Sequence, residues 1–208
     1  MQSRRRRDRS FRLAPMPARF HLLHAGYIRD SGVTVGSSVS LIEDDGAVIV
    51  VDPGLAAGPD AILGPLAALG HSPDDVTHVV LTHHHPDHTV NVALFPRADV
   101  VDAWAHYRGD HWIDHEGDGH RLSPHVWLIM TPGHTNQDLT LLAETDDGVV
   151  ACTHAWWRAD RTPQVDPGAD DQAALEASRR RILELADLVV PGHDEPFRNE
   201  RSGAQSGG

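Results

Sequence analysis

Cysteine is almost absent from this chain of 208 residues: Cys152 is the one such residue and has no internal partner for a disulfide. Nothing in the covalent chemistry therefore calls for an oxidising compartment, and a cytoplasmic protein is the expectation. Because Cys152 ends an apolar run, we expect it in the core and not among metal ligands.

Long apolar runs are missing as well. No stretch approaches the roughly 20 residues of a membrane-spanning helix. The basic segment Met1 to Arg9 is not followed by the apolar stretch of roughly 7 to 15 residues that a signal peptide requires. We therefore expect no membrane segment and no secretion signal.

Positive charge is in short supply, since 18 Lys and Arg residues stand against 30 Asp and Glu residues and the formal net charge is -12. This balance repels polyphosphate backbones and argues against nucleic acid as a partner. Charged or small polar ends are usually mobile, so we expect a disordered basic N-terminus over residues 1–18 and a flexible tail over residues 201–208.

Length and the lack of any internal repeat limit the chain to one unit. A chain of 208 residues can bury one core around a site, but it is too short for two independent cores. We predict a single domain over residues 19–200, acting as a monomer or homodimer.

Apolar runs bounded by turn residues predict a mixed α+β fold, with two mixed sheets facing each other and helices outside. Helices are expected at Pro59–Leu69 and Asp170–Ala186, and the stretch Trp104–Pro124, rich in His, Asp and Gly, is expected to be a long loop. The expected strands are Phe20–Ile28, Ser38–Glu43, Ala47–Val51, Val76–Leu81, Val126–Met130, Asp138–Ala143, Val149–Cys152 and Leu188–Val190.

What the chain has in excess is histidine, with 16 residues, more than its Phe, Tyr and Trp combined. Four candidate ligands lie within six residues just after a predicted strand, where a tight loop can turn them inward together: His83, His85, Asp87 and His88. Imidazole and carboxylate groups suit zinc and other borderline divalent metals. Three more histidines follow later strand ends, namely His134, His154 and His193, so the sequence predicts a metal site.

Four motifs in this order resemble those of the metallo-β-lactamase fold superfamily. They are Val51–Gly54, the His-x-His-x-Asp-His run Thr82–His88, Thr131–Thr135 and Pro191–His193, and the resemblance extends from about Phe20 to Phe197. Within that superfamily, Asn91–Pro96 and Ser178–Leu183 resemble segments of the metallo-beta-lactamase domain-containing protein 1 group.

The resemblance implies a four-layer αβ/βα sandwich with its site at one edge of the two sheets. His83, His85 and His134 would hold one metal, and Asp87, His88 and His193 a second, with Zn²⁺ expected at one or two ions per chain and Fe or Mn as alternatives. The implied reaction is hydrolysis of a small-molecule ester, thioester, lactone or amide by a metal-bound hydroxide, with Asp87 as the catalytic residue that orients it.

One position departs from the family pattern. An aspartate that bridges the two metals is expected after the strand Val149–Cys152, but this sequence has His154 there. A carboxylate can offer one oxygen to each cation, whereas a neutral imidazole offers one lone pair to one metal. His154 therefore ligates one metal terminally, swings away, or carries protons beside a single metal, and we favour the first.

The same change leaves two other functions open. In the persulfide dioxygenase branch of the superfamily, one iron is held by residues matching His83, His134 and His154, so the chain resembles such an oxidoreductase at these positions. The second alternative is a non-catalytic metal-binding domain, which would keep the pocket but would have lost its activity together with the bridging carboxylate.

Other residues near the motifs are given supporting roles. Asp52 is expected to hydrogen-bond a ligand, and His84 to point away from the metals. Trp156 and Trp157 are expected to line the substrate pocket or to pack between the sheets. His106, His111, His115, His120 and His125 are expected in solvent-exposed loop.

Overall fold

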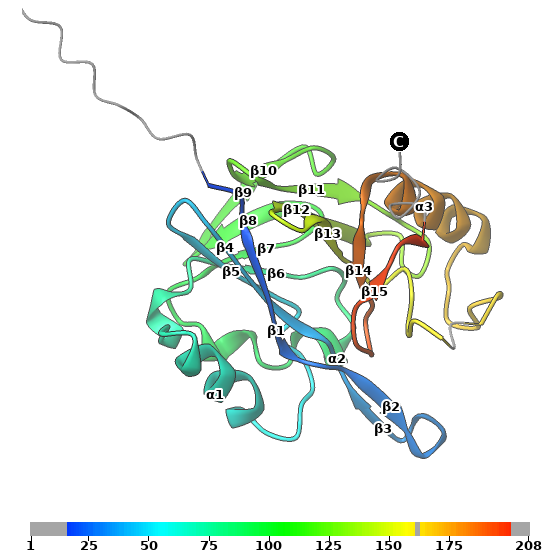
Figure 1. Cartoon of the computed structure of the whole chain (residues 1–208), viewed down its shortest axis with the longest axis horizontal. Helices are drawn as coiled ribbons and strands as arrows, with labels where there is room; N and C mark the ends of the chain where they lie inside the picture. Colours follow the sequence, from blue (N-terminus) through cyan, green and yellow to red (C-terminus); the bar gives the residue numbers. More distant parts are fainter. Residues whose placement is uncertain (1–15, 161–162, 201–208) are drawn as a thin grey trace, which may run out of the picture.

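The structure, a computed structural model, describes residues 16–160 and 163–200 (Figure 1). The predicted basic N-terminus, up to residue 15, and the predicted tail over residues 201–208 lie outside the described residues. Ala18, which we expected in the disordered segment, is buried and donates its N–H to the Glu144 carbonyl at 2.8 Å. The ordered domain therefore begins before residue 19.

The first sheet has seven strands in the order β1–β4–β5–β6–β7–β8–β9, of which β5, β6 and β7 run parallel. Because the carboxyl ends of parallel strands meet at one edge, residues that follow β5 and β6 are brought together there. The bounds are β1 Arg19–His24, β4 Val39–Asp44, β5 Ala47–Val51, β6 His78–Val80, β7 Asp99–Val101, β8 Ala105–Arg108 and β9 His111–Asp114.

The second sheet has six strands in the order β10–β11–β12–β13–β14–β15, and β13 and β14 are its parallel pair. A separate hairpin of β2 (Tyr27–Arg29) and β3 (Thr34–Gly36) pairs with neither sheet, and the 3₁₀ turn η1 (Asp30–Gly32) connects its strands. The bounds of the second sheet are β10 Arg121–Ser123, β11 Val126–Met130, β12 Leu139–Thr145, β13 Gly148–Cys152, β14 Leu188–Val190 and β15 Phe197–Arg198.

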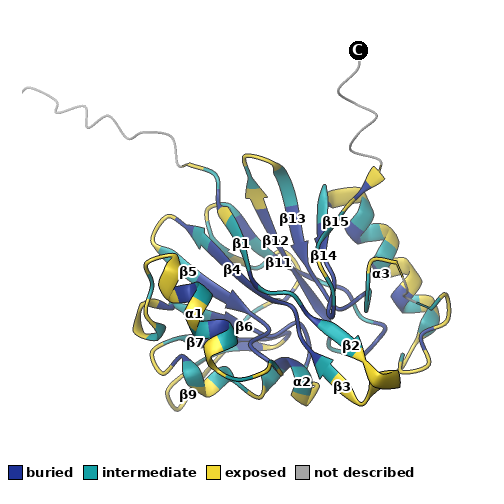
Figure 2. Cartoon of the chain, turned by 60° about the horizontal axis from the view of Figure 1, so that its bottom comes forward, coloured by how far each residue is buried: buried dark blue, intermediate teal, exposed yellow. Residues whose placement is uncertain are grey.

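Figure 2 shows α1 (Asp60–Ala68) and α3 (Gln172–Leu185) on opposite sides of the molecule, with the mostly buried strands of the two sheets between them. The helix α1 packs Ile62 and Leu66 on the outer face of the first sheet, and α3 packs Leu175 and Ile182 on the outer face of the second. Between the sheets lies a third cluster that includes Cys152, as expected. This helix–sheet–sheet–helix order confirms the predicted sandwich. No described helix is long and apolar enough to cross a bilayer.

The prediction of a loop over Trp104–Pro124 is wrong, because the segment contains β8, β9 and β10. All four residues of β9 are exposed. A hairpin at the edge of a sheet need not bury a face, so its sequence lacks the alternation of apolar and polar residues that marks a half-buried strand.

The expected strand Phe20–Ile28 is also broken, into β1 and β2. The break falls next to Gly26, where a Cβ atom would lie 2.6 Å from the His193 Cα. Glycine therefore allows two segments far apart in sequence to approach closely.

Candidate metal centre

Asp52 joins the carboxyl ends of β5 and β6. It adopts the left-handed conformation, with φ of 50°, and its N–H donates to the Val80 carbonyl at 2.9 Å. Its carboxylate accepts the Thr82 N–H at 2.7 Å and the Thr82 hydroxyl at 2.6 Å. The residue before the histidine motif is thus fixed to the end of the neighbouring strand.

The same carboxylate orients His88, which lies in the short helix α2 (Pro86–Thr89). His88 Nδ1 donates to Asp52 Oδ2 at 2.9 Å, and because an ionised carboxylate can only accept, the lone pair of the ring is on Nε2. That Nε2 is buried and has no hydrogen-bond partner in the described chain. A buried acceptor without a donor is costly, so the arrangement suits a bound cation.

Three further histidines are held in the same tautomer by an oxygen behind the ring. His134 Nδ1 donates to Asp166 Oδ2 at 3.0 Å, and His193 Nδ1 donates to the Gly36 carbonyl at 3.0 Å. His83 Nδ1 lies 3.2 Å from the Thr82 hydroxyl, whose own proton goes to Asp52. In each ring Nε2 is left as an acceptor, which is the form that binds metal.

Together with His85 and Asp87, these Nε2 atoms form two groups of three donors. His85 Nδ1 lies 3.0 Å from His83 Nε2 and 3.1 Å from His134 Nε2. Asp87 Oδ2 lies 3.7 Å from His88 Nε2 and 3.6 Å from His193 Nε2. Within each group of three residues, one donor atom from each lies within 4.8 Å of the others. The groups are the two ligand sets that the family resemblance implied.

His154 lies between the two groups. Its donor atom is within 4.8 Å of those of His83 and His88, one from each group. Its Nε2 is 3.2 Å from His193 Nε2, and its buried Nδ1 has no hydrogen-bond partner in the described chain. The ring fits there because position 192 is glycine: a Cβ atom on Gly192 would lie 2.4 Å from His154 Cδ2.

Burial favours the neutral form of four imidazoles in the cluster, those of His83, His134, His154 and His193. Desolvation, reinforced by the neighbouring rings, lowers the pKa of His83 and His154 well below the usual 6.5, and it lowers the pKa of His193 to about 4. Desolvation also lowers the pKa of His134, against the raising effect of Asp166. Neutral rings with converging lone pairs are a donor set that fits divalent metal ions.

A cavity of about 260 Å³ opens on this cluster. Its far wall comes from the β2–β3 hairpin, through Ile28, Gly32 and Val35. Trp157 also lines it, with its ring 6.5 Å from that of His134 and perpendicular to it. The remaining lining residues are His85, Asp87, His134, His154 and His193.

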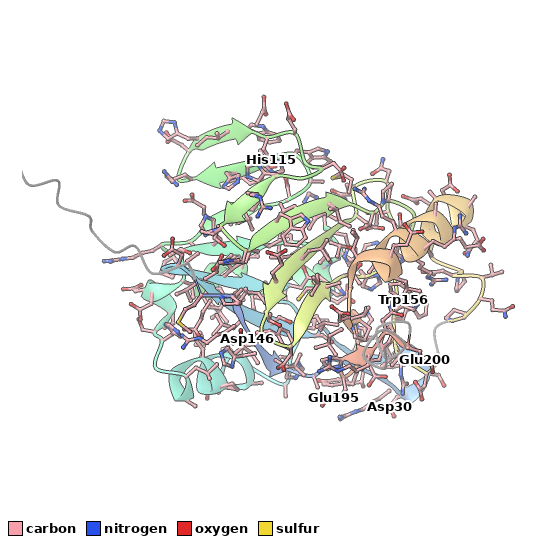
Figure 3. The ribbon with its side chains drawn as sticks, turned by 45° about the horizontal axis from the view of Figure 1, so that its top comes forward. Asp30, His115, Asp146, Trp156, Glu195 and Glu200 are labelled. Carbon is pink, nitrogen blue, oxygen red and sulfur yellow. The ribbon has the colours of Figure 1, made fainter. Side chains whose placement is uncertain are left out.

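The two tryptophans, expected either to line the pocket or to pack between the sheets, have different places: Trp157 lines the cavity and Trp156 does not. The Trp156 ring packs against Phe197 at 5.8 Å between centroids and beneath the Arg179 guanidinium, next to α3 (Figure 3).

Sequence reasoning missed two contributors to the site. Asp166, the acceptor behind His134, is signalled in the sequence only as an acidic residue in a Pro-Gly turn before α3. The hairpin wall has no motif at all. His84 does turn away as expected, since its Nε2 lies 3.0 Å from Asp102 Oδ2.

The fold and this arrangement of donor side chains are those of a metal-binding αβ/βα sandwich protein, and sequence comparison identifies the family. The chain belongs to the metallo-beta-lactamase superfamily, whose family model matches residues 32–193.

Among characterised relatives, the chain is similar to metallo-beta-lactamase domain-containing protein 1. Identity to the Xenopus laevis protein is 34% over 197 residues, which cover 88% of this chain and 82% of the relative. Identity to the human protein is 38% over 177 residues, covering 82% of this chain and 66% of the relative.

More distant matches include proteins named as hydrolases. A hydroxyacylglutathione hydrolase of Stenotrophomonas maltophilia is 37% identical over 106 residues, 48% of this chain and 39% of that protein. A crystal structure of B. thuringiensis AiiA with N-decanoyl-L-homoserine bound at the active site superposes with a TM-score of 0.63 at 19% identity, covering 92% of this chain and 97% of that one. At that identity the superposition supports the fold alone.

Proposed function

We propose that this protein is a metal-dependent hydrolase of a small-molecule ester, thioester, lactone or amide, with His154 in place of the usual bridging aspartate. The observation that carries the proposal is the convergence of seven donor side chains, four of them imidazoles whose Nδ1 is occupied by an oxygen behind the ring.

The proposed ligand sets are those that the geometry groups. His83, His85 and His134 would hold one ion, and Asp87, His88 and His193 a second. A divalent cation there lowers the pKa of water and polarises the carbonyl that is attacked. Zinc is the metal that we propose, because imidazole and carboxylate donors suit it.

Asp87 is the residue that we assign to proton transfer. It is the carboxylate of the cluster that lines the cavity, and its side chain is 26% exposed while the neighbouring imidazoles of His88 and His193 are buried. Asp87 Oδ2 can orient the attacking water and accept its proton as the carbonyl is attacked. The proton then passes to the leaving oxygen, sulfur or nitrogen as that bond breaks.

The shape of the cavity supports a small substrate with an apolar part. Its volume of about 260 Å³ is just below the range of roughly 300 to 1,000 Å³ that is usual for drug-sized ligands. Ile28 and Val35 supply apolar surface on the hairpin side of the cavity, and Trp157 supplies more beside His134. The reactive carbonyl would face the donors while the apolar part rests on the hairpin.

The test combines metal content with hydrolysis. The protein is purified, loaded with zinc or manganese, analysed for bound metal, and assayed on an aryl ester, a thioester, a lactone and an anilide. We expect His134→Gln to lose metal and activity, while His84→Gln, from the same histidine-rich part of the chain but turned away from the donors, retains both. Finding no bound transition metal, with no gain of activity on metal addition, rejects the proposal.

A second function is supported by one feature of the cluster. The rings of His83, His134 and His154 lie close together. The centroid of His154 is 4.3 Å from that of His83 and 4.3 Å from that of His134, and the centroids of His83 and His134 are 5.3 Å apart. Three imidazoles in this arrangement suit a single iron ion, as in a persulfide dioxygenase. Iron in the purified protein and oxygen uptake with a persulfide substrate would favour this function over hydrolysis.

A further inference from the structure

A second group of histidines lies at the other end of the first sheet. His78 begins β6 and Asp99 begins β7, and the two are register partners, so their side chains share one face. His106 on β8 is the register partner of Val101, two residues from Asp99 and therefore on that same face. Val80 and Val101 belong to the core between the sheets, so the group lies on the inner face.

The donor atoms of this group are close enough to share an ion. One donor atom from each of His78, Asp99 and His106 lies within 4.8 Å of the others. His120 places its Nε2 2.7 Å from His106 Nε2. We call these four residues the second histidine cluster, and the seven donors of the candidate metal centre the first histidine cluster.

The second histidine cluster draws on both sheets. His78, Asp99 and His106 belong to the first sheet, while the backbone of His120 is paired to the second. The Leu128 N–H of β11 donates to the His120 carbonyl at 2.8 Å, and the neighbouring Gly119 N–H donates to the Leu128 carbonyl at 2.8 Å. An ion held by the cluster would therefore connect the two sheets near the free edge of β9.

Neighbouring groups fix two of the rings. His78 Nδ1 lies 2.8 Å from the Thr77 hydroxyl, which leaves Nε2 for the cluster. His115 donates from Nε2 to the Asp102 carbonyl and accepts the Gly117 N–H at Nδ1, so both of its nitrogens are occupied. Its ring stacks on His120 at 4.3 Å with an interplanar angle of 15°. We therefore assign His115 to positioning His120 and not to ligation.

The charge of the cluster also suits a cation. Burial and the surrounding imidazoles lower the pKa of His106 to about 4, and burial lowers the pKa values of His78 and His120, so the rings are neutral at pH 7. Asp99 supplies a negative charge; the side chain of its ion-pair partner, Arg108, is 69% exposed. Each carboxylate oxygen has a second lone pair, so the Arg108 contact leaves Asp99 able to ligate.

We propose that the second histidine cluster is a separate divalent-metal site, with His78, Asp99 and His106 as ligands and His120 as the fourth donor. Three imidazoles and one carboxylate suit Zn²⁺, and also Ni²⁺ or Cu²⁺. Nothing in the site faces the substrate cavity, so its ion stabilises the contact between the sheets. The proposal is independent of the proposed function.

The two clusters are distinct sites along the chain and in space. Only four residues lie between His78 and His83, and the five steps along the chain span up to roughly 16 Å when extended. In Figure 3, His115 lies beside β8 and β9, at the opposite end of the molecule from Asp30 in the hairpin turn next to the substrate cavity. Metal bound at one cluster can therefore be removed without a direct change in the other.

The test counts zinc ions in the full-length protein by native mass spectrometry and locates them by anomalous scattering from zinc-loaded crystals. We compare the wild type with His106→Gln and with the control His111→Gln, an exposed histidine on β9 of the same hairpin. Thermal unfolding with and without zinc shows whether each variant folds, and His78→Gln replaces His106→Gln if the latter does not.

We expect His106→Gln to hold one zinc ion fewer than the wild type and to bind the remaining zinc normally, with His111→Gln unchanged. An anomalous peak among His78, Asp99 and His106 is expected in the wild-type crystal. Zinc in excess over the site should raise the Tm of the wild type over that of His106→Gln by roughly 5 to 10 °C. Equal zinc counts in wild type and variant, or a crystal saturated with zinc that shows no peak there, would overturn the proposal.

Discussion

The two histidine clusters are built from the same residue types but are supported differently. In the first, four rings are each held by an oxygen acceptor at Nδ1, and Asp52 alone serves two elements by binding both Thr82 and His88. In the second, His78, Asp99 and His106 stand on strands, the Thr77 hydroxyl lies behind His78 Nδ1 at 2.8 Å, and Asp99 pairs with the largely exposed Arg108.

This difference reflects what each place in the fold provides. Most donors of the first histidine cluster follow strand ends in loops, which have no regular geometry of their own, so hydrogen bonds behind four of its six rings supply the precision that a metal site needs. Three of the four donors of the second cluster lie on a sheet, where the strand register already sets their spacing.

The largest expected difference between the clusters is in the free energy of unfolding when the buried aspartate of each, Asp52 or Asp99, is replaced by alanine. Asp52→Ala leaves the Thr82 N–H and hydroxyl and His88 Nδ1 without their acceptor, and we expect it to lower the free energy of unfolding by about 3–5 kcal/mol. Asp99→Ala removes a pair with an exposed arginine, so about 1 kcal/mol is expected. Urea denaturation of the metal-free variants measures both, and equal losses would contradict the difference in support.

A smaller effect is expected from crowding at His154. Gly192→Ala adds a Cβ atom 2.4 Å from the His154 ring, which should cost about 1–3 kcal/mol by overpacking and shift the ring. Gly58→Ala, where a Cβ atom would meet nothing within 4 Å, is the matched control and should stay within about 0.5 kcal/mol of the wild type. Chemical denaturation measures the free energy of unfolding of both variants. Metal binding that is reduced in Gly192→Ala but not in Gly58→Ala would show that the His154 ring has been displaced.

The pH dependence of stability tests the part that the second histidine cluster plays in the fold. The pKa of His106 is lowered to about 4 in the fold, below the roughly 6.5 of an unfolded histidine. The unfolded chain therefore binds the proton more readily, and this stability is complete above pH 6.5 and lost as the pH falls towards 4. In EDTA, His106→Gln should lose less stability than the wild type between pH 7 and 5. Parallel curves for the two proteins would show that His106 has no part in the loss.

The smallest effect is expected at His84, a histidine among the ligands but outside the cluster. Its ring is partly exposed and its Nε2 contacts Asp102 Oδ2 at 3.0 Å. We expect His84→Gln to change the free energy of unfolding by less than about 1 kcal/mol and to leave metal content unchanged. A loss of metal comparable to that of His134→Gln would place His84 in the site after all.

Much of the fold could be predicted from periodicity. The predicted bounds of β5, β11 and β14 match those of the structure, because buried strands are nearly continuous apolar runs. The histidine loops could be placed at strand ends for the same reason. Short or exposed strands such as β7 and β9 were missed, since they bury too little surface to leave a pattern.

The contacts behind the ligands could not be predicted in the same way. The acceptor of His193 is a backbone carbonyl, which has no sequence signal. Five histidines were predicted in solvent-exposed loop, and four of them are only partly exposed. His106, His115 and His120 contact one another, and His125 Nδ1 lies 2.8 Å from the buried Asp44 carboxylate. His111 is exposed as predicted, but it stands on β9 and His106 on β8, not in a loop. The polar composition of this segment led us to expect its histidines in solvent. A single sequence does not show which polar residues of distant segments contact one another.

The β2–β3 hairpin has a consequence for how this protein could change. It supplies one wall of the cavity through Ile28 and Val35, yet it pairs with neither sheet and supplies no side-chain donor to the first histidine cluster. Substitutions at its cavity-facing positions should therefore alter which molecules fit while leaving the core and the ligands intact. A library confined to those few positions is a direct route to new substrate preferences on an unchanged reactive centre.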